Sequence, residues 1–150
     1  MFGYSKWNRA VNEAGQYCTA MFAGLEQLHG KPVPAQVFGD PYVAGFLQQL
    51  ILHSVNANYC GAADPKIMIS TAEATMDKLL PDLPGIGKQV IQGLIEVNKP
   101  THPFHVNYMV GRREGGEYVV ALLQNDEDKM HARMLGFREF VSRNYLSKGD

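Results

Sequence analysis

The amino-acid sequence predicts a mainly α (α+β) fold, a compact helical domain of about five helices with a β-hairpin before the C-terminal helix. Apolar residues recur at steps of three and four along most of the 150 residues, which is the period of an amphipathic helix. Between residues 104 and 123 the alternation changes to period two around a Gly-Gly pair, as in a hairpin. The length predicts a single globular domain over residues 1–150.

The most regular pattern lies at the start of the chain. It predicts one long helix that ends at Gly30 and Pro32, and its apolar stripe consists of Tyr4, Trp7, Val11, Ala14, Cys18, Met21, Leu25 and Leu28. The opposite face is polar and hardly charged. Such a stripe suits either the core of the domain, which we favour, or a seam between subunits. In the second case the interface residues are Trp7, Val11, Met21 and Leu25.

Two Asp-Pro pairs are typical of helix starts, because Asp caps the free N–H groups and Pro fits the first turn. Asp40-Pro41 predicts a helix that ends at "NANYCG". Asp64-Pro65 suggests another start, but the following "KIMIS" also fits a short strand. A capping box at Ser70 and Glu73 favours a helix from about residue 71 to 80.

The run Leu83-Pro-Gly-Ile-Gly-Lys88 precedes a further short helix expected over residues 86–98. It resembles the hairpin of helix-hairpin-helix DNA-binding modules, in which glycines let backbone N–H groups approach a phosphate. The resemblance covers about one tenth of the chain and implies a nucleic-acid site at Gly85, Gly87 and Lys88.

Two features weigh against that nucleic-acid site. Ile91 stands where the family usually has a small residue, so its bulk is expected to push the two helices apart. Residues 73–96 carry two lysines against four acids, a local charge of −2, which repels phosphate. We therefore favour a plain turn between two helices and keep nucleic-acid binding as an alternative.

The predicted hairpin rests on the alternation from Phe104 to Val110 and on the β-rich "YVVALL" after Gly115-Gly116. Three glycines in six residues argue against one continuous helix, which remains the alternative. Arg112 and Arg113 are expected to pair with Glu114 and Glu117 across the hairpin. Asn125 or Asp126 then caps the last helix.

A carboxylate-x-x-His pattern occurs near the end of the first helix and the start of the last. If these helices pack antiparallel, the two pairs meet and faintly resemble a ferritin-like di-iron site. The candidate metal ligands are Glu26, His29, Asp128 and His131. No further carboxylates are indicated for such a site, so metal binding is a second alternative and we expect no cofactor.

Composition narrows the function further. A formal charge of −1 and a pI near 6.5 argue against a general polyanion binder. The sequence contains no nucleophile elbow, phosphate loop or dinucleotide fingerprint, and no apolar run long enough to span a membrane. Its two cysteines are expected to be reduced core residues of a cytoplasmic protein. The favoured function is therefore a small soluble, non-enzymatic interaction or assembly module that binds a protein partner or a second copy.

Overall fold

A computed structural model describes the backbone of residues 2–147 and the side chains of residues 5–147. Every regular element in this range is helical, and no strand occurs in it. A 3₁₀ turn over Ala35–Gly39 and a π turn over Ser142–Leu146 complete the α-helices, which are α1 (Phe2–Met21), α2 (Leu25–His29), α3 (Pro41–Tyr59), α4 (Pro65–Leu79), α5 (Ile86–Val97), α6 (His105–Leu123) and α7 (Glu127–Val141). The mainly helical prediction is confirmed, whereas the predicted β-hairpin, and with it the α+β class, is wrong.

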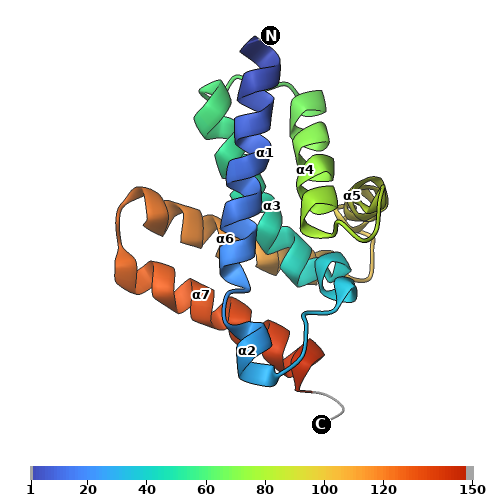
Figure 1. Ribbon diagram of the computed structural model, residues 1–150, viewed down its shortest axis with the longest axis vertical. Helices are drawn as coiled ribbons and strands as arrows, with labels where there is room; N and C mark the ends of the chain where they lie inside the picture. Colours follow the sequence, from blue (N-terminus) through green and yellow to red (C-terminus); the bar gives the residue numbers. More distant parts are fainter. Residues whose placement is uncertain (1, 148–150) are drawn as a thin grey trace.

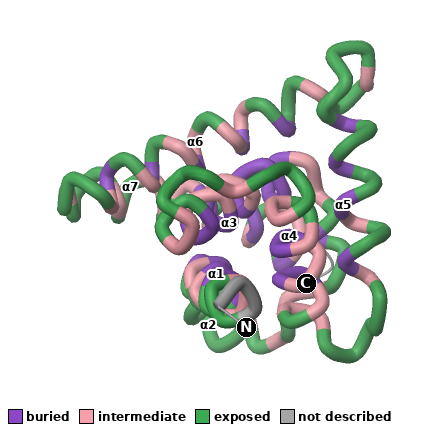
Figure 2. Tube along the Cα trace, turned by 90° about the horizontal axis from the view of Figure 1, so that it is seen from above, coloured by how far each residue is buried: buried purple, intermediate pink, exposed green. Residues whose placement is uncertain are grey.

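Helix α3 is the centre of the fold. It packs against α1, α4 and α6, while α5 lies beside α4, and α7 folds back along α6 (Figure 1). Its sequence explains this position, because most of its residues from Tyr42 to Val55 are buried on several sides. The buried residues of α1, α3 and α4 face one another (Figure 2). No described helix combines the length and hydropathy needed to cross a membrane.

The segment predicted as a hairpin is α6, and its glycines explain the error. The buried residues of α6 recur at helical spacing: Tyr108, Gly111, Gly115, Tyr118 and Ala121. A Cβ atom at Gly111 would lie 2.0 Å from the carbonyl oxygen of Tyr42, and one at Gly115 would lie 2.6 Å from that of Phe46. The glycines therefore permit backbone contact between α6 and α3 and do not form a turn.

The first helix is shorter than its apolar stripe predicts. Helix α1 ends at Met21, and the chain turns before Gly24, whose φ of 84° is left-handed, and re-enters a helix as α2. Leu28, the last residue of the predicted stripe, is 75% exposed as a result. A glycine with positive φ breaks the helix although the apolar spacing continues through it. The side chain of Tyr4, the first residue of the stripe, lies outside the described residues.

The helix starts predicted at the caps Asp40 and Asp126 are confirmed. Asp40 Oδ1 accepts hydrogen bonds from the backbone N–H groups of Tyr42 (2.9 Å) and Val43 (3.2 Å). Asp64 and Asp126 accept in the same way at the starts of α4 and α7. Helix α4 thus begins at Pro65 and not near residue 71, as the capping box predicted, so "KIMIS" is helical and the capping box lies inside the helix. Of the two free cysteines, Cys18 is in the core as expected but Cys60 is exposed.

Candidate functional site

Helices α6 and α7 form an antiparallel pair, called the arm below, whose connecting turn lies far from the other helices (Figures 1 and 2). The arm and the residue before it carry six of the ten large apolar side chains found exposed in the described part of the chain. These are Phe104 (55% exposed), Val106, Met109, Val120, Leu123 (66% exposed) and Leu135. The arm is thus the main exposed apolar surface of the described residues.

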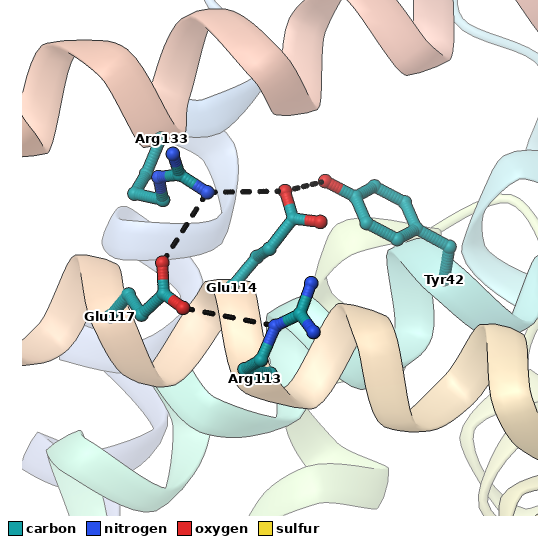
Figure 3. A network of polar contacts seen from close by, with 5 residues as sticks. All are labelled: Tyr42, Arg113, Glu114, Glu117 and Arg133. Carbon is teal, nitrogen blue, oxygen red and sulfur yellow. Dashed lines mark hydrogen bonds and ion pairs between the residues drawn. The ribbon is translucent and has the colours of Figure 1, made fainter.

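A network of polar contacts, called the polar bridge below, joins the arm to α3 (Figure 3). The hydroxyl of Tyr42 donates a hydrogen bond to Glu114 Oε1 at 3.1 Å. Arg133 Nη1 lies 3.7 Å from the same oxygen and 3.3 Å from Glu117 Oε2. Arg113 Nε lies 3.8 Å from Glu117 one turn away along α6. The expected pairing of this arginine with Glu117 is therefore present, but along a helix and not across a hairpin.

Burial makes the inner end of the polar bridge different from its outer end. The side chain of Glu114 is 18% exposed, whereas that of Glu117 is 49% exposed. The pKa of Tyr42 is raised above its ordinary value by burial first, and then by the charge of Glu114 and the hydrogen bond to it. Tyr42 therefore stays a neutral donor, and its hydroxyl fixes the carboxylate of Glu114.

A groove lies on each side of the polar bridge. The tip groove, of about 630 Å³, is lined by Gly116, Val120, Ala121 and Ala132 with Arg113, Arg133, Lys129 and Glu117 among the polar residues around them. The base groove, of about 330 Å³, is lined by Tyr42, Val110, Glu114, Gly136 and Phe140 among others. No neighbouring atom lies within 4 Å of a Cβ placed on Gly136. Small residues therefore leave these grooves open.

The structure places three of the four predicted interface residues in the core and the fourth, Trp7, partly at the surface. Val11, Met21 and Leu25 are buried in the protein's own core. Trp7 is half-buried, and its indole N–H donates to Ser70 Oγ at 3.2 Å. These side chains therefore serve packing of α1 against the rest of the chain, and a partner reaches the buried ones only if the core opens.

The predicted nucleic-acid residues lie at the turn between α4 and α5. The φ of Gly85 is 81°, and Lys88 is exposed. The N–H of Gly87 donates to Asp77 Oδ1 at 2.7 Å, so a carboxylate already occupies the place that a phosphate would take. The helices approach to backbone contact here, since a Cβ on Gly87 would lie 2.1 Å from the carbonyl oxygen of Glu73. Ile91 is buried in the core and does not prevent this approach.

The structure does not bring the two carboxylate-x-x-His pairs together. His29 lies beside the C-terminal end of α7, where its Nε2 is 3.0 Å from Ser142 Oγ. Asp128 and His131 lie in the first turns of the same helix, whose 15 residues span about 20 Å. The cause is that α7 runs across the end of α1 (Figure 1). Among the described residues no group of three or more His, Cys, Asp or Glu is placed to hold a metal ion.

Sequence reasoning missed the arm and the inner part of the polar bridge. The outer pair of the polar bridge could be found from the sequence, because Arg113 and Glu117 are four residues apart, which is the spacing of an ion pair on a helix. Tyr42 and Arg133 are distant in sequence and meet Glu114 only through the fold. Comparison with protein-family models, curated proteins and solved structures gives no match to this chain.

Proposed function

We propose that this protein is a non-enzymatic interaction module that self-associates through the arm. The observation that carries the proposal is the gathering of exposed apolar side chains there, with Val120 51% and Leu123 66% exposed. Several exposed large apolar side chains on one pair of helices are typical of interaction sites, because their burial against a partner is favourable.

A second copy is the occupant that the charges favour. The arm presents both signs, since Arg113, Lys129 and Arg133 line the tip groove while Glu127 and Asp128 are exposed at the start of α7. In a two-fold arrangement the same patch lies on both subunits, so acids of one copy can face cations of the other. The formal net charge of −1 adds little repulsion between copies.

Sedimentation or light-scattering mass, measured from about 1 µM to about 1 mM protein, tests this proposal over binding free energies from about −8 to −4 kcal/mol. The wild type is expected to shift from monomer to dimer within this range. Val120→Glu and Leu123→Glu are each expected to weaken the dimer at least about tenfold, because each places a carboxylate in the apolar contact. Leu28→Glu is the matched control, since Leu28 is an exposed leucine on α2, which lies at the C-terminal end of α7 and far from the turn next to Leu123.

Circular dichroism checks that each variant keeps its helical content. A wild type that stays monomeric at about 1 mM overturns self-association altogether. A dimer that the two arm variants leave as stable as Leu28→Glu does overturns the arm as the interface.

The nucleic-acid and metal hypotheses stay predictions with tests of their own. The first expects salt-sensitive binding of duplex or single strands that Lys88→Glu weakens. The second expects iron, manganese or zinc in freshly purified protein and its loss in His131→Ala. Self-association is preferred because the exposed apolar surface favours it, whereas no contact of the described residues favours either alternative.

A further inference from the structure

A pocket of about 160 Å³ lies between α3, α4, α5 and α6, away from both grooves of the arm. Its walls are mostly aliphatic and include Ile51, Ile91 and Leu94. Ile69 and Ile95 also line it and are 43% and 52% exposed, so they mark its opening to solvent. Within the described residues the lining holds no carboxylate, lysine, arginine or histidine. A charged ligand would therefore lose its hydration there without gaining a partner.

The polar groups of the pocket include the side chain of Gln48. Its Nε2 is the one buried side-chain nitrogen or oxygen of the described residues that has no hydrogen-bond partner. A buried donor without an acceptor costs free energy, so a well-packed protein usually pairs it with protein, water or ligand. Gln48 lines the pocket, so a ligand bound there supplies the acceptor that Nε2 lacks once the amide turns toward it.

We propose that this pocket binds a small uncharged molecule with an apolar body and one hydrogen-bond acceptor, such as a short ketone or ester, whose oxygen accepts from Gln48 Nε2. The size agrees with this class of ligand, because an apolar cavity of about 150 Å³ holds a benzene ring. The aliphatic walls favour the body of the ligand, and the amide selects for its oxygen. The site is independent of self-association through the arm.

Cyclohexanone and cyclohexane are a suitable pair of probes, since they match in shape and differ in the acceptor. In ¹H–¹⁵N and methyl NMR spectra of the wild type, both are expected to shift the methyl signals of Ile91 and Leu94. Only the ketone is expected to shift the side-chain NH₂ signals of Gln48. Its affinity is expected to exceed that of the hydrocarbon about tenfold, the contribution of one hydrogen bond.

Gln48→Leu keeps the size of the side chain and removes the donor, so it should abolish the preference for the ketone without closing the pocket. Val120→Glu on the arm should leave the binding of both probes unchanged, which separates this site from the arm. The proposal is overturned if the ketone shifts no pocket signal, which would leave a bound water as the partner of Gln48. It is equally overturned if Gln48→Leu prefers the ketone as strongly as the wild type does.

Discussion

The two halves of α6 differ in how they meet the rest of the protein. Its first half crosses α3 in backbone contact, with Gly111 and Gly115 against the carbonyl oxygens of Tyr42 and Phe46. Its second half reaches the free end of the arm, where Val120 and Leu123 are exposed. Gly116 belongs to this open half, since the nearest atom to a Cβ placed there is the end of Gln49 at 3.7 Å. Glycine thus allows close packing in one half and leaves free space in the other.

The largest effect is expected from Gly111→Ala. Its Cβ would lie 2.0 Å from the carbonyl oxygen of Tyr42, which belongs to the backbone of α3 and has no rotamer to change. Forced separation of the two helices is expected to lower the free energy of unfolding by about 3 kcal/mol, the upper part of the range for overpacked cores. Urea unfolding measures this change.

Gly93→Ala is the matched control, because Gly93 lies inside α5 with no atom within 4 Å of its Cβ position. This variant should gain about 1 kcal/mol from helix propensity alone. Equal stability of Gly111→Ala and wild type would show that α3 and α6 can move apart freely, contrary to the contact described.

The second effect concerns the polar bridge, whose two glutamates lie near the middle of α6. Glu114→Ala removes the acceptor of the buried Tyr42 hydroxyl and a partner of Arg133, so a loss of about 2 kcal/mol is expected. Glu117→Ala removes a carboxylate that is 49% exposed, and its loss should stay below about 1 kcal/mol. Thermal or urea unfolding of the two variants compares them directly. Losses of equal size would mean that burial does not distinguish the inner glutamate from the outer one.

The sequence could predict features that depend on neighbouring residues, but not features that depend on contact between helices. Aspartate caps act within one turn, so the starts of α3, α4 and α7 follow from neighbouring residues. The role of Gly111 depends on Gly45 and Tyr42 of another helix, because the Cβ position of Gly45 lies 2.3 Å from the carbonyl oxygen of Tyr108. No local rule separates such a glycine from a turn glycine, and the hairpin prediction failed for that reason.

The candidate site was still less predictable. Amphipathic spacing suggested that Leu28 lies in the core and gave no reason to expect Leu123 on the surface. Exposure depends on which helix faces are left without a neighbour once the chain has folded. The sequence therefore predicted helical faces but not the arm, and it predicted Arg113, Glu114 and Glu117 as pairing residues without their connection to Arg133 and Tyr42.

The stability of the protein at alkaline pH tests the burial of Tyr42. The carbonyl oxygen of this residue contacts the first half of α6, and its hydroxyl donates a hydrogen bond to Glu114 of the polar bridge. The pKa of Tyr42 is higher in the folded protein than in the unfolded chain, where tyrosine ionises at about pH 10. Above that pH the unfolded chain loses the proton first, so the contribution of Tyr42 to stability is complete below about pH 10 and is lost as the pH rises.

Between the pKa of Tyr42 in the unfolded chain and its pKa in the folded protein, this one group lowers the free energy of unfolding by about 1.4 kcal/mol per pH unit. Tyr42→Phe should therefore lose stability less steeply than the wild type above about pH 10, by this amount. Cys18, whose pKa burial raises to about 12, adds a similar loss to both proteins and cancels in the comparison. Urea unfolding at a series of pH values gives the two slopes, and parallel curves would contradict the raised pKa of Tyr42.

The smallest effect is expected at two adjacent glycines, where the contrast between the halves of α6 is sharpest. Gly116→Ala should raise the free energy of unfolding by about 1 kcal/mol, because its new methyl group meets only the movable end of Gln49 at ordinary contact distance. Gly115→Ala should lower it, because the same methyl group would lie 2.6 Å from the backbone oxygen of Phe46. Helix propensity is the same at both positions, so an opposite sign in urea unfolding isolates the contact with α3. A loss at both positions would mean that α3 packs on the second half of α6 as tightly as on the first.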